Sequence, residues 1–124
     1  MRAIHHLALG AADVDALARF YRDHLGLTET ARHEDEGGLR SIWLDLGGAI
    51  LMIERATSTR EPPPGGQPTG LFLLALETSP EERTALEARL AAAGHPREEA
   101  TAYTSYFRDP EGNRFAISHY PDAG

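Results

Sequence analysis

His6 is the side chain whose type and position most suggest chemistry in this sequence. It stands in the short apolar stretch AIHHLAL, residues 3–9. An imidazole titrates near neutral pH, so it can act as a general base or donate a hydrogen bond to a ligand. A hydrogen-bonded core histidine is the alternative that the residues alone leave open. Tyr103 is the second candidate, because a phenol can orient a ligand or pass a proton.

Aromatic side chains in the expected strands offer flat surfaces for a ligand. Alternation along TAYTSYFR, residues 101–108, predicts Tyr103 and Phe107 on one face and Tyr106 on the other. Trp43 is a further candidate. Strand aromatics also pack in cores, so we expect at least one of these sets to contact a ligand. Ser118 has no evident base to activate it, so we predict a ligand contact and not a nucleophile.

Composition narrows the classes of function. The 124 residues include no cysteine, which excludes disulfides and thiolate metal sites, so any metal must use nitrogen and oxygen ligands. The net charge is −7 and the twelve arginines are scattered, which disfavours nucleic acid. The acidic balance could favour a cationic small molecule or simply serve solubility. No signal peptide or membrane-spanning stretch is evident, which predicts a cytoplasmic protein with no membrane partner.

The order of expected elements repeats once along the chain. Each half reads as a strand, a capped helix and further antiparallel strands, with Asp13 and Ser79 as helix N-caps and Gly26 and Gly94 as stops. Leu86, Leu90 and Ala93 are expected to form the buried stripe of the second helix. The proline-rich segment 61–70 reads as a linker. The pattern predicts an α+β fold of two βαβββ modules in tandem, about 1–60 and 71–120, forming one domain over 1–124 with a ligand cleft between the sheets.

Three motifs carry a resemblance to a known family. H-x-A-x-x-x-x-D runs from His6 to Asp13, FYRDHLGL spans 20–27 and DPEGN spans 109–113. With the element order, they resemble the vicinal oxygen chelate superfamily of glyoxalase I, ring-cleaving dioxygenases, methylmalonyl-CoA epimerases and bleomycin-resistance proteins. The resemblance covers nearly the whole chain and implies a homodimer, which would also protect sheet edges.

The same resemblance implies where a divalent metal would bind in metal-dependent members. Four strand positions supply the ligands there, and in this sequence they hold His6, Met52, Leu73 and Ala116. Leucine and alanine have no lone pair to give, and the soft thioether of methionine suits a hard cation poorly. We therefore predict no metal and no other cofactor.

The predicted function is that of a bleomycin-resistance-type protein, which binds a small, partly apolar and perhaps cationic molecule without a metal. The expected ligand contacts are His6, Trp43, Met52, Leu73, Tyr103, Phe107, Ala116 and Ser118. One alternative is a glyoxalase-like or dioxygenase-like enzyme whose divalent metal is held by a shifted set, His6, Glu54 and Glu77. Another is metal-free proton transfer by His6 and Tyr103 as catalytic residues.

Overall fold

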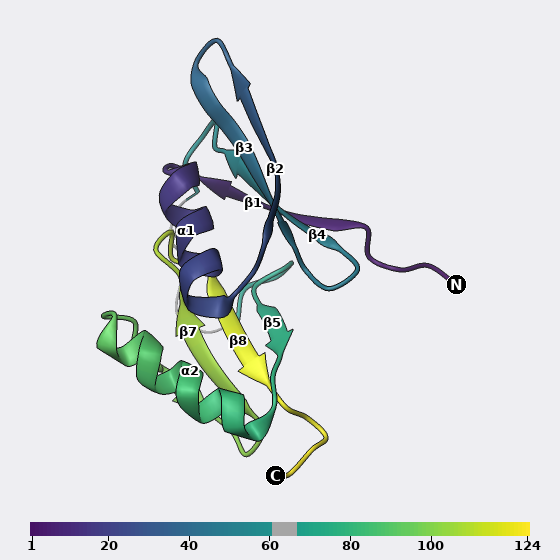
Figure 1. Ribbon diagram of the computed structural model, residues 1–124, viewed down its shortest axis with the longest axis vertical. Helices are drawn as coiled ribbons and strands as arrows, with labels where there is room; N and C mark the ends of the chain where they lie inside the picture. The colour runs from purple at the N-terminus through teal and green to yellow at the C-terminus, as the bar shows by residue number, and fades with distance from the viewer. Residues whose placement is uncertain (61–66) are drawn as a thin grey trace. The chain divides into compact units, whose positions relative to one another are not determined.

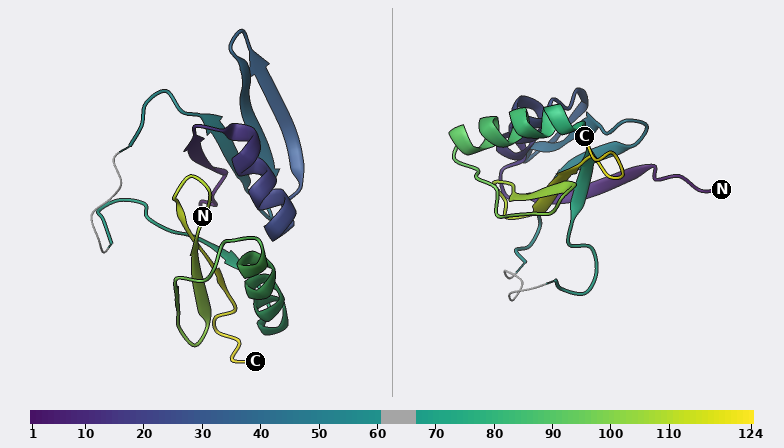
Figure 2. Two further views of the ribbon diagram at one scale, coloured as in Figure 1. Left: turned by 90° about the vertical axis from the view of Figure 1, so that its left-hand side faces the viewer. Right: turned by 90° about the horizontal axis from the view of Figure 1, so that it is seen from below.

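Two compact units, residues 1–60 and 61–124, make up the protein in the computed structural model. The structure describes residues 1–60 and 67–124, so residues 61–66 of the predicted linker lie outside the described residues. Each unit holds one four-stranded sheet and one helix, and each helix lies on one face of its own sheet (Figures 1 and 2). The predicted α+β class and the tandem βαβββ modules are confirmed.

The first unit has the element order predicted from the sequence. Its elements are β1 (His6–Ala11), α1 (Val14–Leu25), β2 (Glu29–Asp35), β3 (Gly38–Asp45) and β4 (Ile50–Arg55). The strand order is β1-β4-β3-β2. β1 runs parallel to β4, and the other two pairs are antiparallel. Glycines with positive φ stand in both hairpin connections, Gly38 at 102° and Gly47 at 66°.

Local signals fix the ends of α1. The Asp13 carboxylate accepts a hydrogen bond from the Ala16 backbone N–H at 3.0 Å, which satisfies one of the free donors of the first turn. Gly26 ends the helix at a φ of 71°, in the left-handed region. Between these ends Leu17 and Tyr21 are completely buried. Both predicted caps are confirmed.

The two faces of the first sheet differ in character. α1 packs against β1, β3 and β4. The buried side chains on that face are Ala11, Ile42, Leu44, Leu51 and Ile53, and Leu7 and Leu9 beside them are half-buried. Side chains one position away along each strand point to the opposite face, which carries no helix of this unit. We call this opposite face the open face of the first sheet.

The second unit repeats the arrangement with shorter strands. Its elements are β5 (Leu74–Glu77), α2 (Pro80–Ala92), β6 (Glu99–Ala100), β7 (Thr104–Arg108) and β8 (Arg114–Ser118). The strand order is β5-β8-β7-β6, with β5 parallel to β8. The Ser79 hydroxyl accepts from the Glu82 backbone N–H at 3.1 Å, as the capping-box spacing predicted. The face of this sheet away from Phe107, Phe115 and Ile117 is the open face of the second sheet.

α2 is attached to its sheet in a way that the apolar pattern did not predict. Leu90 is buried, Leu86 is half-buried and Ala93 is exposed beyond the last helical residue, so the expected stripe is only partly correct. Arg83 instead donates to the Glu87 carboxylate at 3.1 Å and to the Ser105 hydroxyl at 2.8 Å.

Arg83, Glu87 and Ser105 form a polar network between α2 and β7. The Ser105 hydroxyl, which is completely buried, donates to Glu87 at 2.7 Å. Burial by itself would raise the pKa of the Glu87 carboxyl, but hydrogen bonds from Ser105 and Arg83 outweigh it and lower that pKa. The network therefore holds Glu87 ionised in the folded protein.

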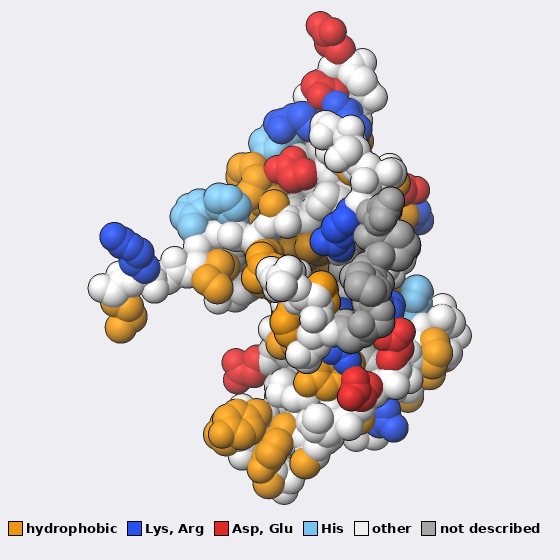
Figure 3. Space-filling model, turned by 180° about the vertical axis from the view of Figure 1, so that it is seen from behind, with side chains coloured by type: hydrophobic (Ala, Val, Ile, Leu, Met, Phe, Trp, Pro, Cys, Tyr) orange, Lys and Arg blue, Asp and Glu red, His pale blue; other side chains and the backbone are white. Residues whose placement is uncertain are grey.

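The helices of the described residues are too short to cross a bilayer. On the face of the molecule drawn in Figure 3, acidic and basic side chains are interspersed.

Candidate ligand-binding site

Met52 and Trp43 lie side by side on the open face of the first sheet. The pairing of β3 with β4 sets Trp43 opposite Met52, and the pairing of β1 with β4 sets Ala8 on the other side of Met52. These neighbouring side chains give the middle of the face an apolar strip. The sequence predicted both Met52 and Trp43 as ligand contacts, and the structure places them together.

His6 is exposed on the same face, one rung away. It pairs with Ile50, two residues before Met52 on β4. Its Nδ1 lies 3.0 Å from Nδ1 of His5, and the two rings meet edge to face at 5.3 Å. One of these nitrogens must carry the proton of this contact and the other must accept it. Histidine side chains appear pale blue on the surface in Figure 3.

The next rung along the open face is polar. Ser41 lies opposite His33 on β2 and opposite Glu54 on β4. Ser41 is completely buried, and the His33 ring packs on the Trp43 ring with centroids 4.7 Å apart. Sequence reasoning gave His33 no chemistry and did not consider Ser41. The signal available was the alternation of β3, which sets Ser41 on the same face as Trp43.

The open face of the second sheet contains Ala116. Its neighbours on the rung are Ala75 and Tyr106, and it is completely buried. Arg114 lies over the Tyr106 ring at 4.3 Å. The predicted contacts Ala116 and Ser118 share this face, and Leu73 lies directly before β5 and is half-buried.

Ser118 is held by a neighbour on the open face of the second sheet. Its hydroxyl lies 2.8 Å from the Thr104 hydroxyl, so each already has a partner. This arrangement suits a polar ligand contact, and Glu77 lies opposite Ser118 on β5.

Tyr103 and Phe107 lie in different surroundings. β7 begins at Thr104, so Tyr103 lies before the strand, with its ring against those of His119 and Tyr120. Phe107 is completely buried and stacks on Phe115 at 5.3 Å, as a core residue. Tyr106 is the aromatic residue of β7 on the open face. The strand was predicted from residue 101 and begins three residues later.

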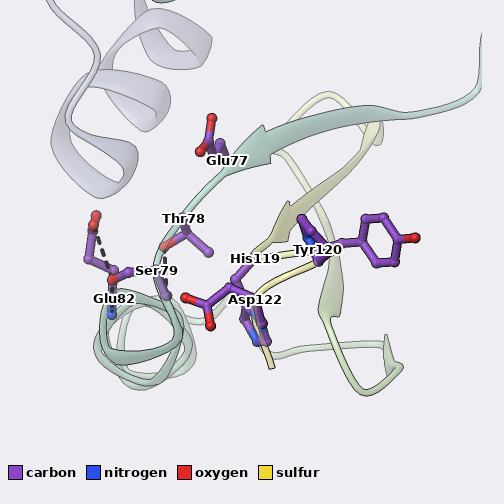
Figure 4. A pocket seen from close by; sticks show the side chains of 8 residues that line it. Glu77, Thr78, Ser79, Glu82, His119, Tyr120 and Asp122 are labelled. Atoms are coloured by element: carbon purple, nitrogen blue, oxygen red, sulfur yellow. Dashed lines mark hydrogen bonds between the residues drawn. The ribbon is translucent and has the colours of Figure 1, made fainter. Parts of the chain in front are cut away.

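A hollow of about 500 Å³ opens at one end of the second sheet (Figure 4). Its lining residues are Glu77, Thr78, Ser79, Glu82, His119, Tyr120, Pro121 and Asp122. The sequence did not predict it, because the C-terminal turn that closes it gives no periodic signal. His119 is fixed there, since its Nε2 accepts from Arg83 at 3.0 Å and its Nδ1 meets the Asp122 carbonyl oxygen.

The donor set does not fit a divalent metal. Of the four positions that the resemblance implies, only His6 offers a suitable lone pair. The alternative set of ligands, His6, Glu54 and Glu77, does not meet within the first unit either. Glu54 pairs with Gly10, which lies four residues after His6, so His6 and Glu54 are about 13 Å apart along the sheet. In the described part of the chain, no three His, Asp or Glu side chains group closely enough to hold an ion.

Comparison with known families decides the classification. The family model described as Glyoxalase/Bleomycin resistance protein/Dioxygenase superfamily matches residues 3–117. The chain belongs to this superfamily. The family resemblance inferred from His6, FYRDHLGL and DPEGN is thereby confirmed. No curated protein matches the sequence.

Solved structures of this superfamily share the fold of the chain. A lactoylglutathione lyase from Agrobacterium tumefaciens is 24% identical, with 95% of this chain and 93% of that chain covered and a TM-score of 0.70. A glyoxalase family protein from Enterococcus faecalis is 24% identical, with 95% and 98% covered and a TM-score of 0.76. A glyoxalase/dioxygenase from Nostoc punctiforme is 21% identical, with 98% and 92% covered and a TM-score of 0.80.

Proposed function

We propose that this superfamily member binds a small, partly apolar molecule against the open face of its first sheet, without a metal. The proposal is carried by the side chains at the positions where the family resemblance implies metal ligands: Leu73 and Ala116 have no lone pair to give, and the thioether of Met52 is a soft donor. Met52 beside Trp43 presents carbon and sulfur, which favour burial of an apolar group over coordination of an ion.

His6 supplies a polar contact for the same ligand. It is exposed on the open face, and its contact with His5 leaves the second ring nitrogen, Nε2, for a ligand. The net charge of −7 favours a ligand that carries a positive charge. We also propose that the protein is a cytoplasmic homodimer. Sedimentation of the purified protein distinguishes the mass of a dimer from that of a single chain.

Intrinsic fluorescence tests the binding proposal directly, because Trp43 is the only tryptophan in the chain. Titration with toluene and with benzylamine should change Trp43 emission saturably, equally with and without a chelator. Replacing His6 by Ala should weaken benzylamine binding more than toluene binding. Binding that appears only after Mn²⁺, Ni²⁺ or Zn²⁺ is added would instead support the metal-dependent enzyme.

A further inference from the structure

Three buried side-chain atoms have no hydrogen-bond partner within the described residues, and they lie together. They are His33 Nε2, Ser41 Oγ and Trp43 Nε1. Ser41 is the neighbour of His33 across the β2–β3 ladder, and the His33 ring packs on Trp43 at 4.7 Å. All three side chains belong to the open face of the first sheet, next to Met52.

Three buried polar atoms without partners lower the stability of the folded protein. A buried polar atom without a partner loses its hydrogen bonds to water and receives none in return. The second unit shows the usual solution: Ser105, as completely buried as Ser41, bonds to both Glu87 and Arg83. The contrast between two fully buried serines points to a partner for Ser41 outside the described residues.

The chemistry of the three atoms restricts that partner. The indole N–H of Trp43 can only donate, and the Ser41 hydroxyl can donate as well, so together they suit one carbonyl oxygen with its two lone pairs. His33 Nε2 can accept an N–H. A carboxamide offers both groups in one plane. A carboxylate is disfavoured, because Ser41 also lies opposite Glu54 on β4.

We propose that His33, Ser41 and Trp43 form a carboxamide anchor, which binds the amide group of the ligand while its apolar part lies against Met52. The inference rests on the proposed small-molecule binding. Because the three atoms are covered, the His33 ring turns away from Trp43 to admit the amide. The structure thus assigns the ligand to the class of apolar amides.

Benzamide, benzoate and toluene test this assignment, with Trp43 emission as the signal. Wild type should bind benzamide more tightly than the other two. Ser41→Ala should weaken benzamide binding about tenfold, the loss expected for one buried hydrogen bond. The same change should leave toluene binding within twofold.

Thermal unfolding of the free protein supplies a readout that does not depend on a ligand. Ser41→Ala removes an unpartnered hydroxyl and should leave the midpoint unchanged or raise it. The matched control Ser105→Ala breaks the bonds to Glu87 and Arg83 and should lower the midpoint by about 4 °C or more.

The outcomes separate the anchor from the proposed function. If the three probes bind alike, or if Ser41→Ala leaves benzamide affinity unchanged, the anchor is wrong and the binding function stands. If Ser41→Ala lowers the midpoint as Ser105→Ala does, Ser41 has a structural partner and the anchor is again wrong. If none of the probes binds, the anchor and the proposed function both fail.

Discussion

Met52 lies opposite Trp43 across the β3–β4 ladder, and it is one of the positions to which the family resemblance assigns a metal ligand. A thioether beside an indole makes a soft, apolar contact surface. The pair therefore offers an apolar surface where the resemblance would place a metal ligand.

Changing Met52 separates shape from polarity at this surface. Met52→Leu keeps the volume and apolar character, so toluene affinity should stay within twofold. Met52→Glu places a charge on the apolar strip and should weaken toluene binding about tenfold or more. Titration of Trp43 emission measures both. Equal affinities for the two variants would show that the ligand does not contact Met52.

Ala116→Glu should destabilise the protein strongly. Ala116 is completely buried between Ala75 and Tyr106, and the nearby Arg114 guanidinium already lies over the Tyr106 ring and bonds to Glu99, so a new carboxylate there would be buried with little compensation. The expected loss is about 3 kcal/mol or more in the free energy of unfolding. Urea denaturation measures the loss.

Ser118→Ala is the control for Ala116→Glu, since it removes one hydroxyl contact with Thr104 on the same face. Its cost should be about 1 kcal/mol. A stable Ala116→Glu variant that binds a divalent ion would show that a metal site survives in the fold.

The Glu87 network predicts a pH dependence of stability. The folded-state pKa of Glu87 lies below its ordinary value of 4.5. A lowered carboxyl pKa stabilises the folded state fully above the unfolded-state value, and this contribution is lost as the pH falls through the folded-state value. Wild type should therefore lose stability between pH 7 and acid conditions more steeply than Glu87→Gln. Parallel pH profiles for the two proteins would contradict the assignment.

Asp109 should prove structural and not functional. Its carboxylate accepts from the backbone N–H groups of Glu111 and Asn113 at 3.0 and 2.9 Å, and it is nearly buried. Asp109→Ala should cost about 2 kcal/mol of unfolding free energy and leave ligand affinity unchanged. Glu98→Ala, which removes an exposed pair with Arg108, is the control and should cost under about 1 kcal/mol.

The parts of the fold that sequence predicted are those fixed by neighbouring residues. Asp13 and Ser79 each accept a hydrogen bond from a backbone N–H three residues later, and Gly26 turns the chain at its own position. Their roles as helix caps can therefore be read from the local sequence. The hairpin glycines act in the same local way. The open-face positions of Trp43, Met52 and Ala116 also agree with simple alternation.

What the sequence missed depends on residues far apart in the chain. Arg83 meets Ser105 across 22 positions, and its helical spacing gave no hint that it faced the sheet. His33 joined Trp43 only through the pairing of two strands. The start of β7 was misplaced for a different reason: it was predicted at residue 101 and lies at Thr104, because a strand start cannot be read from β-prone residues that precede a bend.

The metal content of the purified protein tests the central claim most directly. Protein purified without chelator and dialysed against metal-free buffer should carry well under one equivalent of iron, manganese, nickel or zinc per chain, because His6 alone cannot retain an ion against dialysis. One tightly held equivalent that survives dialysis would contradict the account.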